Sequence, residues 1–311
     1  MKPKILIASS SFYKMSLVSQ KTLKKLEQKC VVVKNPHKRR LKTKELIKYG
    51  KDCIGIIAGL EPFGKEILQN LSNLKVISRD GVGIDNIDLK TAKKLGIKIT
   101  NTPQATTQAV SELTICLMIA LLRHLPQINQ DMHQNKWNQL HGYLLQNKTV
   151  GIIGMGRIGK RVCELLKPFG CNIIGNDIKP DLAWFRRHKI SHVHKRTLYK
   201  QSNIVTLHVS YSPQNFHLIS YKQFSQMKKG VNFLNLSRGS IVNEKALIKY
   251  LTNKHISAAA LDVFEKEPYI GSLAKLKNII LTSHIGASTL ESRKQMQTDA
   301  VNNLLEELKK R

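Results

Sequence analysis

Three polar residues late in the chain have the types and positions to move a proton and to hold a carboxylate. Arg238, Glu267 and His284 each follow an apolar, strand-like run. Because parallel sheets bind ligands at the carboxyl ends of their strands, we expect the three side chains to share one crevice. An arginine can fork onto a carboxylate, a histidine exchanges protons near neutral pH, and a neighbouring carboxylate favours its cationic form. Taken singly, each residue also fits an ordinary surface contact.

A glycine pattern in the middle of the chain predicts a dinucleotide site. Gly154, Gly156 and Gly159 stand in G-x-G-x-x-G register directly after an apolar run. Such glycines allow a tight turn, the approach of a pyrophosphate and close helix packing, and the helix N-terminus offers N–H donors. Asp177 ends the next strand, where it can bond the adenosine ribose and repel a 2′-phosphate. The predicted cofactor is therefore NAD rather than NADP.

Together, the two groups of residues predict one reaction. A hydride would move between C4 of the nicotinamide and C2 of a small 2-hydroxy or 2-oxo acid, while His284 moves the proton on oxygen. No metal is expected. His188, His192 and His194 have a spacing that could ligate one, but they lie in a stretch rich in Lys and Arg that disfavours a divalent cation.

The elements that must position these residues are typical of an α/β protein with doubly wound parallel sheets. Strand-like apolar runs alternate with helix-like stretches almost throughout. A long helix is expected over about 105–123 and a charged last helix over 290–308. Strands are expected at 5–8, 31–33, 54–58, 76–78 and 97–100, and then from 149 and at 173–175, 204–207, 231–234, 258–261 and 279–281.

The length and the position of the glycine pattern predict two domains. A chain of 311 residues is long for a single core. Since the nucleotide fingerprint lies in mid-chain, the residues before it should form a separate α/β domain. The active site is then expected between the two.

Composition narrows the partners and the location. The formal charge of +30, from 51 Lys and Arg against 21 Asp and Glu, should concentrate small anions. The most basic run, 34–44, has no interleaved aromatic residues, so specific nucleic-acid binding is not expected. Five cysteines without a C-x-x-C pair favour a reducing, cytoplasmic location. The apolar stretches 5–8 and 113–122 are too short for a signal peptide and a membrane span.

Over nearly its whole length the chain resembles the D-isomer-specific 2-hydroxyacid dehydrogenase family. It is most similar to the phosphoglycerate dehydrogenase-like and hydroxypyruvate or glyoxylate reductase-like subgroup. Besides the glycine fingerprint, the matching segments are N-L-K-V-I-S-R-D-G-V-G-I-D-N-I-D-L (73–89), A-V-S-E-L-T-I (109–115), M-K-K-G-V-N-F-L-N-L-S-R-G-S-I-V-N-E-K-A-L (227–247), L-D-V-F-E-K-E-P (261–268) and S-H-I-G-A-S-T (283–289).

The resemblance implies a Rossmann NAD-binding domain, residues 101–286, inserted in a flavodoxin-like substrate-binding domain made of residues 1–100 and 287–311. It implies a homodimer formed largely through the nucleotide domain. It also implies the catalytic roles. Arg238 would bind the carboxylate and carbonyl of the substrate, and His284 would be the acid/base. Glu267 would orient the imidazole of His284 and favour its cationic form.

The resemblance implies further contacts. Backbone N–H groups of Val82 and Gly83 would hold the substrate carboxylate, and Asp262 would meet the nicotinamide carboxamide. The other cofactor contacts implied are Arg157 and Ile158 at the pyrophosphate, Leu236 beside the nicotinamide, and Thr107 on the hinge helix.

Departures from the family pattern bear on the substrate. Glu61-Pro62 stands where members that oxidise 3-phosphoglycerate often carry Arg-Ser, which argues against phosphate recognition there. The segment 208–217 lacks the usual H-x-P-x-T-P beside the nicotinamide.

Trp137 is expected to be buried in the core with an anchored N–H. Because the chain stops at Arg311, a serine-binding regulatory domain is not expected.

The sequence leaves the substrate and one rival function open. The substrate is of the 3-phosphoglycerate, glycerate/hydroxypyruvate or glyoxylate type. The rival is a non-catalytic regulator that senses NAD(H) with the same fold, since such proteins can retain all three catalytic residues. A nucleic-acid binder driven by charge alone is a third, weaker alternative.

Overall fold

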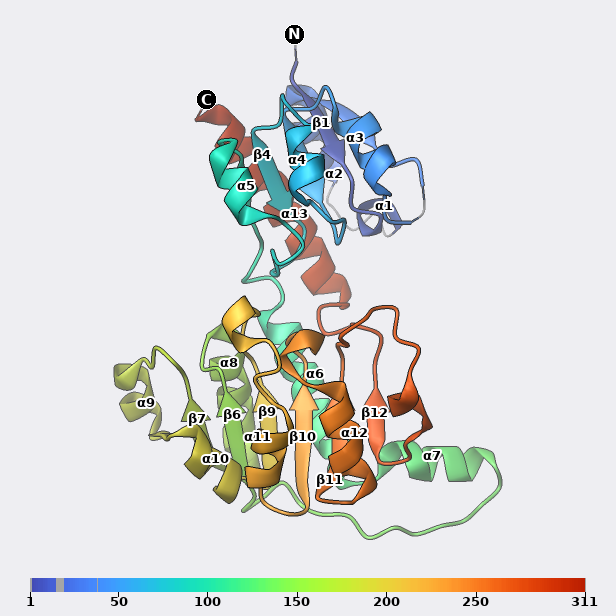
Figure 1. Ribbon diagram of the computed structural model, residues 1–311, viewed down its shortest axis with the longest axis vertical. Coiled ribbons are helices and arrows are strands. Elements are labelled where there is room, and N and C mark those ends of the chain that lie inside the picture. The colour runs from blue at the N-terminus through green and yellow to red at the C-terminus, as the bar shows by residue number, and fades with distance from the viewer. Residues whose placement is uncertain (1, 15–19, 38, 311) are drawn as a thin grey trace. The chain divides into compact units, whose positions relative to one another are not determined.

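The computed structural model describes residues 2–14, 20–37 and 39–310, and divides into two compact units. The first unit comprises Met1–Thr106 and Ser288–Arg311, and the second comprises Thr107–Ala287. Each unit is built on one parallel sheet (Figure 1). The predicted α/β fold with two doubly wound sheets is therefore confirmed.

The first unit has a five-stranded sheet in the order β2-β1-β3-β4-β5, which is the flavodoxin-like order. Its central strands β3 and β4 are buried along their whole length, as expected for a sheet covered on both faces. The strands are β1 (Lys4–Ile7), β2 (Val31–Lys34), β3 (Gly55–Ala58), β4 (Val76–Arg79) and β5 (Lys98–Thr100).

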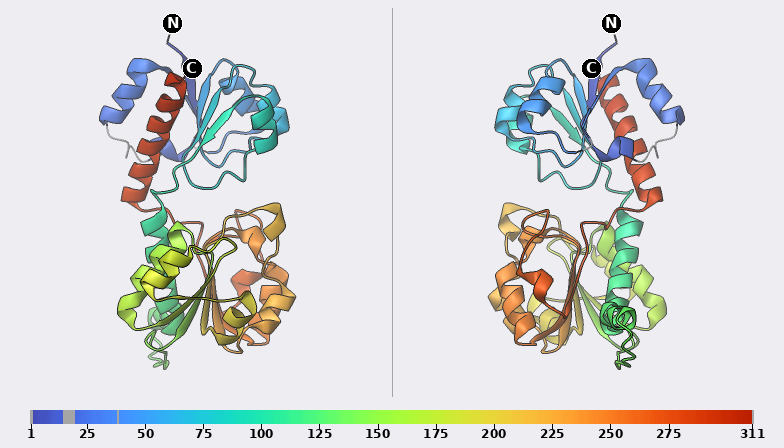
Figure 2. Two further views of the ribbon diagram at one scale, coloured as in Figure 1. Left: turned by 90° about the vertical axis from the view of Figure 1, so that its left-hand side faces the viewer. Right: turned by 90° about the vertical axis from the view of Figure 1, so that its right-hand side faces the viewer.

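Helices cover both faces of this sheet because the side chains of each strand alternate between them. Ile5 and Ile7 pack with Leu304 of α13 (Leu290–Lys309) on one face, which α2 (Gln20–Lys29) also covers, whereas Leu6 faces the other side (Figure 2). That other side is covered by α3 (Thr43–Gly50), α4 (Lys65–Gln69) and α5 (Leu89–Lys94). The short α1 (Ser11–Lys14) follows β1.

The second unit has a seven-stranded sheet in the order β12-β11-β10-β9-β6-β7-β8, the Rossmann order with one further strand. Every predicted strand is present. The sequence did not predict β8, a two-residue exposed edge strand without an apolar pattern. The strands are β6 (Thr149–Ile153), β7 (Asn172–Asn176), β8 (Ser191–His192), β9 (Ile204–Leu207), β10 (Val231–Asn235), β11 (Ile256–Leu261) and β12 (Ile279–Leu281).

Two groups of helices sandwich the second sheet (Figure 2). One face carries α6 (Thr107–Leu122), α8 (Arg157–Leu166) and α9 (Leu182–His188). The other carries α10 (Lys195–Gln201), α11 (Tyr221–Gln226) and α12 (Glu244–Thr252). Within the described residues no single helix is long and apolar enough to cross a membrane; α6 and α7 (Leu125–His133), bent by 66°, meet that test only as a pair, by length and composition.

The segment after α6 corrects one prediction. Trp137 is 78% exposed, so the expectation of core burial is wrong. The residue lies in a stretch without regular structure that follows α7 and runs along one end of the second unit (Figure 1). The apolar side chains of Leu140, Tyr143 and Leu144 in the same stretch are also exposed.

Candidate active site

The three predicted catalytic residues lie after neighbouring strands of the second sheet. Arg238 follows β10, Glu267 lies in the loop after β11, and His284 follows β12. Nδ1 of His284 lies 2.8 Å from Oε2 of Glu267. The other oxygen of Glu267 accepts the N–H of Phe264 at 3.2 Å. Nδ1 therefore faces the carboxylate, which leaves Nε2 as the atom that can exchange a proton with a substrate.

Asp262 fixes the turn that carries His284. Its Oδ1 accepts the hydroxyl of Thr282 at 2.6 Å and the N–H of Ile285 at 2.8 Å, and its Oδ2 accepts the N–H of Gly286 at 2.7 Å. His284 has a φ of 56°, in the left-handed region that a histidine seldom adopts. Such a conformation persists only where the surroundings hold it, and the buried carboxylate of Asp262 does so.

The loop of Arg238 packs directly against the loop of Glu267. A Cβ on Gly239 would lie 1.8 Å from the carbonyl carbon of Phe264, so only glycine allows this approach. Asn235 donates its side-chain N–H to the Arg238 carbonyl at 2.9 Å, and the Arg238 guanidinium donates to the Ser237 carbonyl at 2.8 Å. The half-buried guanidinium thereby lies close enough to Glu267 for its charge to act on that carboxylate.

The electrostatics keep Glu267 ionised. Burial alone would raise its pKa, but the hydrogen bond and charge of His284, the N–H of Phe264 and the charge of Arg238 outweigh burial. The pKa of Glu267 therefore lies below its ordinary value, and the residue carries a full negative charge at neutral pH. This negative charge lies 2.8 Å from Nδ1 of His284 and fixes the orientation of the imidazole.

The glycine turn follows β6, at the point where the strand order reverses between β6 and β9. Gly154 has a φ of 93°, and a Cβ on Gly159 would lie 2.0 Å from the Gly154 carbonyl oxygen. At Gly156 nothing lies within 4 Å of where a Cβ would be, so this side of the turn is open. Since α8 begins at Arg157, its first N–H groups, those of Arg157 and Ile158, stand at this opening. These features fit the pyrophosphate of NAD.

Asp177 follows β7 beside this turn. Its Oδ2 accepts the N–H of Met155 at 2.7 Å, and its Oδ1 accepts the N–H of Lys179 at 2.8 Å. The two bonds fix the orientation of the carboxylate. Because a carboxylate has about four acceptor positions, two remain for the hydroxyls of a ribose.

The other predicted residues lie as follows. Leu236 is buried among side chains of the face that α6 and α8 cover. Thr107 begins α6, and its carbonyl accepts the hydroxyl of Ser111 at 2.7 Å. Val82 and Gly83 belong to the first unit, in the loop after β4. The roles assigned to these residues by the resemblance stay predictions.

His208 is a residue that sequence reasoning passed over. It follows β9, and its backbone oxygen would lie 2.4 Å from a Cβ on Gly154. Burial lowers the pKa of its imidazole to about 3, so the ring is neutral, and Nε2 lies 3.0 Å from the hydroxyl of Thr206. A neutral ring here adds no charge beside the turn. The sequence signal that could have pointed to His208 is its position at the start of segment 208–217, which departs from the family pattern.

The histidines of the Lys- and Arg-rich stretch have structural contacts. His188 stacks on Trp184 with ring centroids 4.1 Å apart, and His192 meets the edge of Phe185 at 5.3 Å. Among the residues that the structure describes, no group of three or more His, Cys, Asp or Glu side chains could hold a metal ion.

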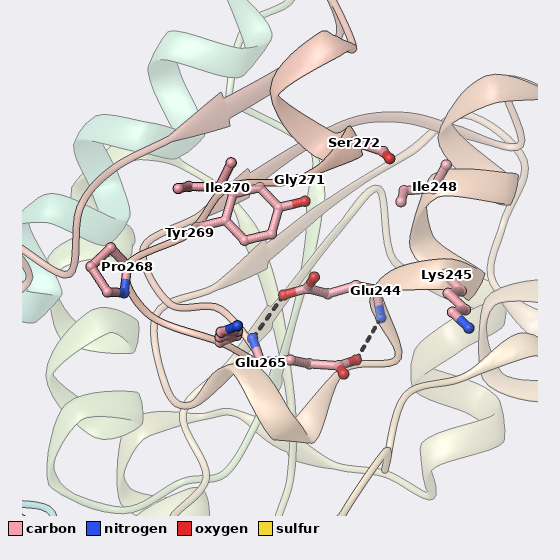
Figure 3. Close-up of a pocket in the computed structure, with 10 residues that line it drawn as sticks. Glu244, Lys245, Ile248, Glu265, Pro268, Tyr269, Ile270, Gly271 and Ser272 are labelled. Atoms are coloured by element: carbon pink, nitrogen blue, oxygen red, sulfur yellow. Dashed lines mark hydrogen bonds between the residues drawn. The ribbon is translucent and has the colours of Figure 1, made fainter.

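A surface cavity of about 360 Å³ lies behind the Glu267 loop (Figure 3). Glu244 and Glu265 line it, and each carboxylate accepts the backbone N–H of the other residue, at 3.0 and 2.7 Å. Tyr269 and Ile270 form its apolar wall. Neither His284 nor Arg238 lines this cavity, so it is not the place where the predicted chemistry would occur.

Comparison with known proteins bears on this arrangement. The sequence model of the "D-isomer specific 2-hydroxyacid dehydrogenase, NAD binding domain" matches residues 115–286, more than half of the chain. The hydroxypyruvate reductase of Thermotoga maritima is 37% identical over 250 residues, which cover 78% of this chain and 80% of that protein. The glyoxylate reductase of Thermococcus litoralis is 38% identical over 253 residues, 78% of this chain and 76% of that protein.

Other relatives extend the comparison. The D-3-phosphoglycerate dehydrogenase of Methanocaldococcus jannaschii is 38% identical over 265 residues, but these cover only 50% of that longer protein. Among solved structures, a glyoxylate reductase from Paecilomyes thermophila superposes with a TM-score of 0.88 at 30% identity, over 98% of this chain and 94% of that one. All four are named as enzymes, and none of them supports a regulator.

Proposed function

The chain belongs to the D-isomer-specific 2-hydroxyacid dehydrogenase family and is an NAD-dependent oxidoreductase, and on this basis we propose that its substrate is a small, unphosphorylated 2-oxo acid of the hydroxypyruvate or glyoxylate type. The product would be the D-2-hydroxy acid. The 2.8 Å contact between His284 and Glu267 carries the proposal for the reaction. The burial and the hydrogen bonding of Glu61 support the choice of an unphosphorylated substrate.

Glu61 makes the loop after β3 a poor phosphate site. The residue is only 1% exposed, and its Oε2 accepts the N–H of Gly59 at 2.6 Å. Asn86 donates its side-chain N–H to the Glu61 carbonyl at 2.6 Å, which holds the loop in place. A buried carboxyl offers a phosphate dianion no counter-charge. Two of the similar proteins, named hydroxypyruvate reductase and glyoxylate reductase, agree with an unphosphorylated substrate.

In the proposed mechanism the residues of this chain bind the acid and supply the proton. Arg238 binds the carboxylate and polarises the carbonyl of the substrate. The ionised Glu267 holds the Nδ1–H of His284, so that Nε2 can donate a proton to the carbonyl oxygen. The glycine turn and Asp177 would hold NADH, and the bound nicotinamide would supply the hydride for C2. Oxidation of the hydroxy acid runs through the same groups, with Nε2 unprotonated at the start.

The test is NADH oxidation with glyoxylate, hydroxypyruvate, pyruvate and phosphohydroxypyruvate, with His284→Ala as the inactive control. We expect kcat/KM for hydroxypyruvate or glyoxylate to exceed that for phosphohydroxypyruvate by about 100-fold or more, a difference of about 2.7 kcal/mol. A preference for the phosphorylated acid would contradict the proposed substrate.

We also propose that the protein is a cytoplasmic homodimer. The location is supported by the five cysteines, all of which are free thiols. The dimer is supported by an exposed apolar surface on and after α7, since patches of this kind mark association sites. Its exposed members are Leu125, Met132, Trp137, Leu140, Tyr143 and Leu144.

Sedimentation of the double variant Trp137→Ser/Leu144→Ser tests the dimer. We expect the variant to sediment as a monomer where the wild type sediments as a dimer. Ile270→Ser is the matched control, because Ile270 is 97% exposed but lies outside this surface. If the double variant kept the mass of the wild type, another surface would have to form the dimer.

A further inference from the structure

A buried arginine lies beneath the loop of the first unit that is predicted to hold the substrate carboxylate. Arg79 ends β4 and is 5% exposed. Its guanidinium lies against the loop at Gly81, where a Cβ would be 2.7 Å from Nη1. Nη1 also donates to the backbone carbonyl of Asp80 and lies 3.5 Å from that of Ala58. The positive charge therefore lies within the loop and close to its backbone.

The loop itself is held from several sides. The N–H of Asp80 bonds the Ala58 carbonyl at 2.8 Å, and Gly81 and Thr102 exchange bonds of 3.1 and 3.0 Å. The side chain of Asn101 donates to the Val82 carbonyl at 2.7 Å. Such bonds fix the direction of the next N–H groups before any ligand arrives.

The next N–H groups along the loop are those of Val82 and Gly83. Within the described part of the chain no hydrogen bond is made by the N–H of Val82 or of Gly83, and both residues are only half-buried. Consecutive N–H groups fixed in this way form a site for an anion, and a cation behind them strengthens it. The strengthening is large here because a buried charge is poorly screened by water.

We propose that Arg79 is a positioning residue for the substrate: its buried charge shapes the loop and strengthens the binding of the substrate carboxylate to the N–H groups of Val82 and Gly83. This inference rests on the proposed function. Arg79 does not touch the acid, and it acts through the backbone of Asp80 and Gly81.

Two buried carboxyl groups, those of Asp80 and Glu61, interact with the charge of Arg79. The net charge near the loop therefore depends on whether these groups are protonated. Asp80 is 4% exposed; its Oδ2 accepts the hydroxyl of Ser9 at 3.1 Å, whereas its buried Oδ1 has no partner among the described residues. Burial raises the pKa of Asp80 and of Glu61 against the charges of Arg79, Arg293 and Arg40. Protonated carboxyls would leave the charge of Arg79 uncancelled.

The experiment compares Arg79→Met, Arg79→Lys and the wild type in steady-state reduction of hydroxypyruvate and glyoxylate. We expect Arg79→Met to raise KM about 10-fold with kcat and the Kd of NADH within about 2-fold, and Arg79→Lys to recover most of the loss, because about 1.4 kcal/mol corresponds to 10-fold. Ser78→Ala is the matched control. It removes a buried hydrogen bond of 2.8 Å from the neighbouring position of β4 and should lower the melting temperature without moving KM.

A second readout does not depend on turnover. Oxalate, in the presence of NADH, should raise the melting temperature of the wild type and of Ser78→Ala much more than that of Arg79→Met. If Arg79→Met bound oxalate as tightly as the wild type, or if the wild type gave no shift, the role of Arg79 would be refuted whatever the activity. Failure of the wild type to reduce any acid of the panel would instead refute the proposed function.

Discussion

Glu267 and His284 are the residues on which the direction of proton transfer depends in the proposed mechanism. The pKa of Glu267 lies below its ordinary value, so its negative charge is present at neutral pH and is lost only in acid. Reduction requires a proton on the imidazole, whereas oxidation requires the unprotonated ring.

Glu267→Gln removes that charge while keeping a side chain of the same size. Because the imidazolium is then less stable, we expect reductase activity at pH 7 to fall by about 10-fold or more and to recover in part as the pH is lowered. The oxidation profile should move to lower pH as well. The measurement is kcat/KM against pH in both directions. His284→Ala should lose activity at every pH, and an unshifted profile in Glu267→Gln would mean that the two residues are not coupled.

Asp177 belongs to the same scale, since we expect its carboxylate to decide between NAD and NADP as cofactor. It is anchored by the N–H groups of Met155 and Lys179, so it cannot swing away from a 2′-phosphate. We expect the wild type to prefer NADH strongly. In Asp177→Ala the ratio of kcat/KM with NADH to kcat/KM with NADPH should fall by about 10-fold or more. A wild type that used NADPH as well as NADH would show that the carboxylate does not discriminate.

At the scale of elements, most strands could be predicted because they are buried runs of apolar residues between helices. β8 could not, since two exposed residues at a sheet edge carry no pattern. Trp137 was predicted wrongly because composition cannot tell an aromatic side chain of the core from one on an uncovered segment. The candidate catalytic residues could be proposed from the sequence because each lies in the segment that follows a strand. The network around Asp262 could not, since it joins residues that are 20 to 24 positions apart.

That network predicts the behaviour of the turn after β12. Asp262→Asn replaces one acceptor oxygen by an amide that would face the donors of Thr282, Ile285 or Gly286. We expect kcat to fall about 10-fold and the free energy of unfolding to fall by about 1–3 kcal/mol, because a buried donor loses its partner. Kinetics and urea unfolding of the variant give both numbers. Thr282→Val is a milder comparison, since it removes only one of the three bonds. Full activity in Asp262→Asn would show that the carboxylate does not position His284.

At the scale of the whole molecule, the charge of +30 should govern how anions reach the protein. A net positive field speeds the encounter with an anionic acid and with NADH, and salt screens it over about 8 Å at 0.15 M. We therefore expect kcat/KM for glyoxylate to fall several-fold between 20 and 500 mM NaCl while kcat changes little. A stopped-flow or steady-state salt series checks this. If kcat fell by the same factor, salt would act on a step after substrate binding and not on the encounter.

The path of the chain through the first unit has a consequence for its synthesis. Ile5, Ile7 and Val76 pack on Ala300, Val301 and Leu304 of α13, which is the last helix described. Until α13 has been made, this face of the sheet is covered by α2 but lacks the cover of α13, although the second unit is already complete in sequence. A nascent chain that ends near residue 287 should therefore hold a folded second unit and a first unit that is sensitive to protease and exposed to chaperones. The first unit can reach its native state only after α13 has been translated.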